Sequence, residues 1–157
     1  DTMTGLGNRT AFLEENKSNA IFPGMISYIM MDANNLKTIN DTLGHNKGDE
    51  LIITIAKCMR KAVGHNGQCY RIGGDEFVII LKNKTAAETE EIINKVRCEI
   101  EFADKQSDIT ISVAIGYVWT DTEQKNLEDL MQHADDEMYQ DKKKTKENKS
   151  KENTHSI

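Results

Sequence analysis

Two adjacent acidic residues, Asp75 and Glu76, follow a pair of glycines in the segment Arg71–Leu81, which reads RIGGDEFVIIL. Gly73 and Gly74 predict a two-residue hairpin turn with positive φ angles, because glycine adopts that conformation without steric cost. The missing Cβ atoms would also let a metal ion or a ligand approach the backbone closely. An ordinary acidic hairpin tip gives the same pattern, so a chemical role requires a second carboxylate that reaches the same place.

That second carboxylate is Asp32, which follows a buried apolar strand predicted over Met25–Met31. In a βαββαβ sandwich the first strand commonly lies beside the central hairpin, so we expect Asp32 and Asp75 to converge. Two carboxylates and a backbone carbonyl such as that of Ala33 are oxygen ligands that Mg²⁺ accepts, with substrate phosphates completing the octahedron. Two such ions can bind the attacking and leaving oxygens of a phosphoryl transfer. Taken alone, Asp32 is more simply a solvated acid at a strand end.

Length, charge and cysteine content exclude several classes of protein. The chain has 157 residues, is 38% hydrophobic and carries a formal net charge of −6, which favours one domain and argues against a general nucleic-acid binder. Its three cysteines show no C-x-x-C spacing and lie in apolar segments, as expected for reduced cysteines of a cytosolic domain. No apolar run reaches the ~20 residues of a membrane span, and no signal peptide is visible. The sequence opens without a Met in a turn-rich motif, so we expect a domain of a longer chain.

The remaining segments predict the elements that position these acids. Alternation over Ile109–Val118 predicts a strand with two different environments. The order strand, two helices, hairpin, helix, strand, helix predicts an α/β (α+β) sandwich with a ferredoxin- or palm-like βαββαβ core, whose mainly antiparallel central sheet is flanked by helices. A polar, disordered tail is expected over 147–157, after a domain of residues 1–146. Five helices are predicted. The first runs from Arg9 to about Asn16, the second follows a cap at Asn34 or Asn35, and the third follows a polar turn at His45–Asp49. The fourth follows the capping box Thr85–Glu88, and the last follows Asn126.

Four segments, taken in order, resemble the signature of the GGDEF family, the diguanylate cyclases that join two GTP molecules into cyclic di-GMP. They read DTMTGLGNR, DANNLKTINDTLGHNKGDE, RIGGDEF and ADDEMYQDKK, and together they span nearly the whole chain. The resemblance implies a nucleotidyl-cyclase-like fold and a nucleotidyltransferase that attacks the α-phosphate with a 3′-hydroxyl and releases pyrophosphate. It also implies the cytoplasmic output domain of a bacterial second-messenger protein, which could be membrane-anchored through missing N-terminal segments.

The resemblance assigns catalytic and metal-binding roles to individual residues. Asp32, the Ala33 carbonyl and Asp75 would bind Mg²⁺ or Mn²⁺. Asp75 would also be the candidate base for the 3′-hydroxyl, because a neighbouring metal lowers the pKa of the attacking oxygen. Glu76 would supply further negative charge near the metals. Lys37 would offset phosphate charge as a compact ammonium, although a solvated helix lysine gives the same pattern.

The other site residues implied by the resemblance bind GTP. Asn40 and Asp49 would recognise guanine, since an amide pairs with the purine edge and a carboxylate accepts from N1–H and the 2-amino group. His45 is a further candidate in the same segment. Each of these residues also has a simpler explanation. Asn40 could be a helix-surface residue, Asp49 a helix N-cap and His45 a turn residue. The lysines of the C-terminal segment could be solvated tail residues. Gly73 and Gly74 would let the hairpin backbone lie against the nucleotide, and Lys142 and Lys146 would contact its phosphates.

The sequence departs from the family pattern at several positions. Asn34 stands where most members have a second Asp, and Asn35-Leu36 replaces a usual aromatic pair. Lys146 replaces the usual Arg, which removes a bidentate phosphate fork.

Three functions are compatible with these residues. The first is an active cyclase, in which two domains meet as a homodimer, each holding one GTP, under an upstream sensory or regulatory domain. The second is a catalytically weak or inactive domain that binds GTP and regulates a partner. The third, a palm-like transferase acting on nucleic acid, is disfavoured by the acidic net charge.

Many members of this family carry an Arg-x-x-Asp product-inhibition site a few residues before the glycine pair, where this chain has Gly64, His65, Asn66 and Gly67. Neither a guanidinium fork for phosphate nor an acid for guanine is present there. We therefore predict that cyclic di-GMP at low micromolar concentration does not inhibit the initial rate through this loop. Strong non-competitive inhibition that disappears when residues 64–67 are replaced would contradict the prediction.

Overall fold

The computed structural model describes residues 1–123 and 125–155. The order of strands and helices is the predicted one, so the α/β sandwich is confirmed. Its elements are α1 (Arg9–Asn19), β1 (Ile26–Ala33), α2 (Leu36–Leu43), α3 (His45–Val63), a short 3₁₀ turn at Gly64–Asn66, β2 (Gly67–Arg71), β3 (Glu76–Lys82), α4 (Ala86–Gln106), β4 (Val113–Thr120) and α5 (Leu127–His155).

The strands form one antiparallel sheet in the order β2-β3-β1-β4. At its centre, Met31 of β1 pairs with Phe77 of β3 on one side and with Ile115 of β4 on the other. Every residue of β1 is buried, and so is the apolar run Phe77–Leu81 of β3. Strands covered on both faces have such continuous apolar sequences. The prediction that the first strand lies beside the hairpin is confirmed.

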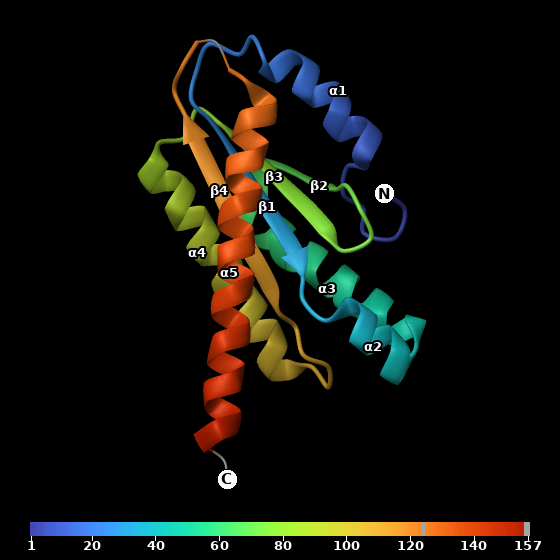
Figure 1. Cartoon of the computed structure of the whole chain (residues 1–157). Coiled ribbons are helices and arrows are strands. Elements are labelled where there is room, and N and C mark those ends of the chain that lie inside the picture. The colour runs from blue at the N-terminus through green and yellow to red at the C-terminus, as the bar shows by residue number, and fades with distance from the viewer. Residues whose placement is uncertain (124, 156–157) are drawn as a thin grey trace.

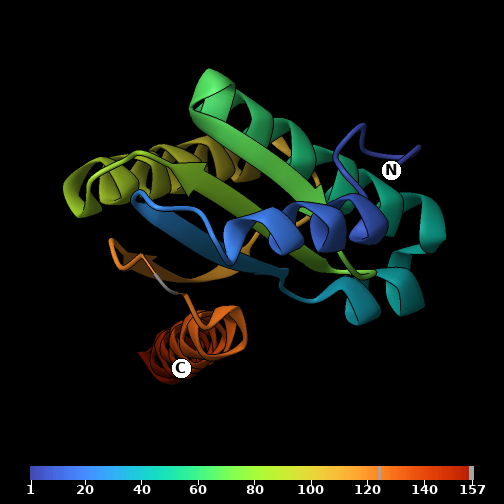
Figure 2. The same cartoon turned by 90° about the horizontal axis from the view of Figure 1, so that it is seen from above.

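Helices cover both faces of the sheet (Figure 1). Figure 2 shows α3 and α4 on one side of the sheet and α1 and α5 on the other. Successive residues of β1 point to opposite faces, so Ile29 belongs to the core beneath α3 and α4. Met30 belongs to a second core with Phe12 of α1 and Ala134 of α5. The elements that carry the predicted site therefore pack on a sheet with two apolar faces.

The predicted side-chain caps at Thr85 and Asn126 are present, whereas the one predicted before α2 is not formed. Thr85 and Glu88 form the capping box: Thr85 Oγ1 accepts from Glu88 N, and Glu88 Oε1 accepts from Thr85 N, both at 3.1 Å. Asn126 Oδ1 accepts from Asp129 N at 3.2 Å before α5. At the start of α2, Asn35 is the cap residue, but it has a φ of 66° and makes no side-chain cap bond.

The connection between β2 and β3 is wider than predicted. It comprises residues 72–75 instead of two glycines, and neither Gly73 nor Gly74 has a positive φ. The backbone N of Ile72 and of Gly73 donate to Glu76 O at 2.9 and 3.4 Å, and Arg71 Nη2 donates to Gly74 O at 2.9 Å. These bonds close a four-residue loop without the positive φ angles that a tight turn requires.

Two other predicted boundaries are wrong. Residues 45–49 are not a turn, because α3 begins at His45 directly after Gly44, whose φ of 91° makes the corner between α2 and α3. The last strand begins at Val113 and not at Ile109. Ile111 N donates to Asp104 Oδ1 at 2.8 Å, which ties the segment before the strand to α4 instead of to a neighbouring strand.

The polar segment 147–157, predicted to be a disordered tail, continues α5 as a helix through His155, while residues 156–157 lie outside the described residues. The segment contains no Gly or Pro to break a helix, and the part of α5 that packs on β4 and β1 supplies the helical nucleus. Figure 1 shows α5 continuing beyond the sheet. The domain boundary placed at residue 146 falls inside this helix. Among the described residues, none of the helices is long and apolar enough to cross a membrane.

Gly116 of β4 allows α5 to approach the sheet closely. A Cβ at this position would lie 2.2 Å from Ala134 O and from Met138 N, which are backbone atoms of the helix. We expect Gly116→Ala to lower the free energy of unfolding by about 2 kcal/mol or more, because the helix must move off the sheet. Urea denaturation measures this. Gly74→Ala, whose Cβ would meet nothing within 4 Å, is the control, and equal midpoints for both variants would contradict the prediction.

Candidate active site

The carboxyl end of β1 brings the two predicted acids together. Ala33 N donates to Asp75 O at 2.8 Å, which fixes the hairpin loop to the end of β1. Asp32 is only 8% exposed, and Asp75 is partly buried. The Asp75 carboxylate is one of the groups that raise the pKa of Asp32. The predicted convergence of Asp32 and Asp75 is therefore present in the structure.

The environment of Asp32 is unfavourable for a carboxylate. Oδ1 is buried and has no hydrogen-bond partner, whereas Oδ2 accepts from Lys142 Nζ of α5. Burial raises the pKa of Asp32 above its usual value, and the Asp75 carboxylate raises it further, although the Lys142 ammonium acts in the opposite direction. The contact with Lys142 therefore does not fully compensate the negative charge of the buried Asp32 carboxylate.

A cavity of about 270 Å³ lies beside these acids, between the end of β1, α2 and α5. Ala33 and Asp75 line it on the strand side, and Lys37 lines it from α2. Lys142 and Lys146 line it from α5. The cavity therefore has an acidic edge that suits a cation and basic walls that suit a polyanion.

A hard cation fits the acidic edge. Within residues 1–123 and 125–155, no three His, Cys, Asp or Glu side chains group closely enough to hold a metal ion. Asp32, Asp75 and the Ala33 carbonyl supply only part of an oxygen shell, as is usual for Mg²⁺ sites that water and substrate phosphates complete. The unpartnered Oδ1 of Asp32 is the observation that supports this fit.

The residues predicted to bind guanine lie where α2 meets α3 and do not line this cavity. Asn40 of α2 approaches Gly48 of α3 so closely that a Cβ on Gly48 would lie 1.8 Å from Asn40 Oδ1. Asp49 follows Gly48 and is exposed, as is His45 one turn earlier in α3. Because α3 begins at His45, Asp49 is not the helix N-cap. Asn40 thus lies against the residue that precedes Asp49.

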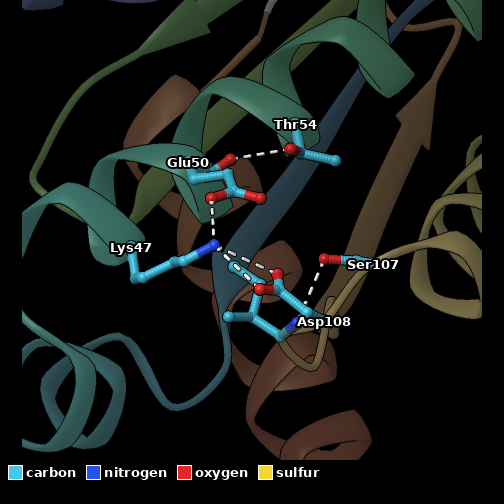
Figure 3. Close-up of polar contacts among 6 residues, drawn as sticks. Lys47, Glu50, Thr54, Ser107 and Asp108 are labelled. Carbon is cyan, nitrogen blue, oxygen red and sulfur yellow. Dashed lines mark hydrogen bonds and ion pairs between the residues drawn. The ribbon is translucent and has the colours of Figure 1, made fainter.

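A surface ion-pair network holds the first turns of α3 to the segment 107–112 (Figure 3). Lys47 Nζ lies 2.9 Å from Glu50 Oε2 and 3.0 Å from Asp108 Oδ2. Both contacts are exposed to solvent, so they contribute little to stability.

The segment 107–112 also holds the end of β1, since Asn34 N donates to Ser112 O and Asn34 Nδ2 donates to Ser112 Oγ, both at 2.9 Å. Asn34 thus has an anchoring role.

Glu76 and the two glycines differ in their relation to the cavity. Glu76 pairs with Asp32 across the sheet, but it is exposed and lines a separate hollow between α1 and α5. A Cβ on Gly73 would lie 2.7 Å from Glu76 Oε2, whereas a Cβ on Gly74 would meet no atom within 4 Å. The structure therefore groups Asp32 with Asp75 and leaves the Glu76 side chain outside the cavity.

Three further residues contribute to this region and were not predicted from the sequence. Arg71 holds the hairpin loop through Gly74 O, and its Nη1 lies 3.5 Å from Asp1 Oδ2. Thr145 and Lys149 of α5 line the same cavity as Asp75. The spacing of Thr145 and Lys149 from Lys142 would have indicated a shared face only if a helix had been predicted there.

Comparisons with known proteins agree on one family. Residues 1–148 match the family model described as "Diguanylate cyclase, GGDEF domain". The chain is 33% identical over 149 residues to diguanylate cyclase DgcN of Escherichia coli (strain K12), covering 90% of this chain and 36% of DgcN. It is 28% identical over 138 residues to cyclic di-GMP phosphodiesterase PdeB of Shewanella oneidensis, covering 86% of this chain and 16% of PdeB. The chain thus spans about a third of DgcN and less of PdeB.

Solved structures confirm the fold. The crystal structure of the GGDEF domain of DgcB from Caulobacter crescentus, in complex with c-di-GMP, matches with a TM-score of 0.79 and 25% identity, over 91% of this chain and 89% of that one. The FimX GGDEF domain from Pseudomonas aeruginosa matches with a TM-score of 0.80 at 19% identity, covering 92% of this chain and 93% of that one.

Asp32→Asn should remove metal binding while preserving the size of the side chain. We expect the affinity for Mn²⁺ alone to fall by at least about tenfold, because affinity for a hard cation depends on the charge of its ligands. Titration of Mn²⁺ by electron paramagnetic resonance measures this. Asp121→Asn, at an exposed acid after β4, is the control. Equal Mn²⁺ affinity in the Asp32→Asn variant and the wild type would contradict the prediction.

Proposed function

The chain belongs to the GGDEF family of diguanylate cyclase domains, and we propose that it is an active member that condenses two GTP molecules into cyclic di-GMP and pyrophosphate. One observation carries the proposal: Asp75 lines a cavity whose other walls carry lysines, and Asp32 lies beside it, paired with the cavity-lining Lys142. A site for phosphoryl transfer requires this combination, with negative groups for a cation and positive groups for phosphates.

The reaction consists of two equivalent transfers. In each transfer, the 3′-oxygen of one GTP forms a bond to the α-phosphorus of the other. The bond from that phosphorus to the oxygen bridging to the β-phosphate breaks, and pyrophosphate leaves with the electron pair. The 3′-hydroxyl proton passes to a base, for which Asp75 is the candidate because its carboxylate borders the cavity beside Asp32.

The residues around the cavity divide the remaining work. Mg²⁺ or Mn²⁺, held by Asp32, Asp75 and the Ala33 carbonyl, would supply charge neutralisation and polarisation of phosphate oxygens. Lys37 and Lys146 offset the charge of the phosphates. Lys142 contacts Asp32 and also lines the cavity, so it can turn to phosphate once a cation neutralises Asp32.

Guanine recognition falls to the junction of α2 and α3. Asn40 supplies an amide for the purine edge, and the exposed Asp49 accepts from N1–H and the 2-amino group. His45 lies one turn before Asp49 and borders the same site. The backbone at Gly73 and Gly74 lies against the nucleotide, since Gly74 faces open space. Adenine offers neither donor to Asp49, so ATP is rejected.

Turnover requires a homodimer. The acid and the lysines that line the cavity supply groups for the phosphates of one GTP, so each domain binds one GTP and two domains meet face to face. The domain acts in the cytoplasm and passes on the signal of an upstream sensory or regulatory domain in the full-length protein.

The alternative is a catalytically weak or inactive domain that binds GTP and regulates a partner. Two observations favour it: Asn34 donates its amide to Ser112 instead of offering a further carboxylate, and one relative, PdeB, is named a phosphodiesterase. This alternative predicts that GTP binds without forming product.

The test is to incubate the purified protein with GTP and Mg²⁺ and to detect cyclic di-GMP by mass spectrometry. The wild type should form product from GTP and none from ATP. Asp75→Asn should fold normally and lose at least about a hundredfold in turnover, because it removes a charged ligand and the base. Asp121→Asn should retain full activity. Product from Asp75→Asn at near the wild-type rate would show that Asp75 has been assigned wrongly, and GTP binding without product in the wild type would favour the regulatory alternative.

A further inference from the structure

The side of α5 that faces the cavity carries more positive charge than the residues assigned above account for. Lys142, Thr145, Lys146 and Lys149 all line the cavity that Asp75 borders. Their spacing of i, i+3, i+4 and i+7 places them on one face of the helix. Lys149 therefore extends the basic wall by one turn beyond Lys146.

These lysines differ in whether an acid neutralises them. Lys142 forms an ion pair with Asp32. Lys37, Lys146 and Lys149 form no ion pair within the part of the chain that the structure describes. Unpaired ammonium groups around one cavity repel one another and concentrate anions. The cavity is therefore more positive at its α5 side than a single phosphate would require.

We propose that Lys149 is a further GTP-binding residue, which contacts the phosphates of the triphosphate that leave as pyrophosphate, with the Thr145 hydroxyl as a neighbouring donor. The proposal rests on the proposed function, because it assumes that the α-phosphorus reacts beside Asp75. Lys149 is seven residues beyond Lys142, which is about 10 Å along the helix axis. Its ammonium thus lies toward the part of the cavity remote from Asp32, where the terminal phosphates extend.

A structural role is the competing explanation for Lys149. The residue also borders a neighbouring hollow that Glu101 and Asp104 of α4 line. However, Asp104 Oδ1 already accepts from Ile111 N at 2.8 Å, and neither acid pairs with Lys149. A structural role would appear as a change in unfolding temperature and would affect all nucleotides equally.

The experiment compares Lys149→Ala with Lys143→Ala in the same protein. Both variants remove one positive charge from α5, but Lys143 Nζ lies 4.7 Å from the centre of the Tyr139 ring and does not line the cavity. We expect Lys149→Ala to raise the KM for GTP and the dissociation constant of Mg²⁺-pyrophosphate by roughly threefold to tenfold, as for one exposed charge-assisted contact. The affinity for GMP should stay within about twofold, because GMP lacks the terminal phosphates. The kcat should also stay within about twofold, because a contact that is equally strong in the bound substrate and in the transition state changes KM and leaves kcat unchanged. Lys149→Arg should retain wild-type constants.

Each outcome separates this inference from the proposed function. If Lys149→Ala and Lys143→Ala bind pyrophosphate equally and share one KM, the inference is wrong, while product formation by the wild type leaves the cyclase proposal intact. A loss that is equal for GTP and GMP and accompanies a lower unfolding temperature would also overturn it in favour of a structural role. If the wild type forms no product, the cyclase proposal fails, and pyrophosphate binding alone decides the role of Lys149.

Discussion

The burial of β1 on both faces is the constraint on which this structure depends. A strand without solvent contact along its length can carry a charged residue only where it ends, and in β1 that residue is Asp32. The pairing with β3 and the bond from Ala33 N to Asp75 O then bring the hairpin loop to the same point. Because α5 packs on β1 and β4 from the other face, Lys142 reaches Asp32 from a distant part of the chain. The site is thus a consequence of how the core is assembled.

The same arrangement explains why the site lowers the stability of the folded protein when no ligand is bound. A buried carboxylate oxygen without a partner is destabilising, and a second carboxylate nearby increases the cost. Lys142 offsets part of this cost at one oxygen. On the other side of the cavity, unpaired lysines repel one another. A divalent cation and a polyphosphate would relieve both conditions at once, and under the proposed function the binding of one would favour the binding of the other.

The features that local chemistry determines could be predicted from the amino-acid sequence. The apolar run Phe77–Leu81 and the capping box at Thr85 are specified by neighbouring residues, and Asp32 could be paired with Asp75 from the order of strands alone. The wider hairpin loop was missed because bonds from Arg71 and to Glu76 O, not the glycines, define it. The position of Lys149 beside the cavity was missed because its segment has no apolar periodicity. Its helical form depends on the packing of the preceding turns, and the direction in which it faces depends on how α5 crosses the sheet.

The close contact at Gly116 fixes one part of α5 to the sheet, while the C-terminal turns of the helix extend beyond the sheet. The helix contacts β4 closely at Ala134 and Met138 and is held again at Asp141, whose Oδ2 accepts from Ile115 N at 2.8 Å. At 1.5 Å per residue, Lys142 lies about 1.5 Å beyond Asp141 and Lys149 about 12 Å beyond it. Any tilt of the helix about these contacts therefore displaces Lys149 much further than Lys142. Small angular changes at the sheet would open or close the outer end of the cavity while the ion pair at Asp32 hardly moves.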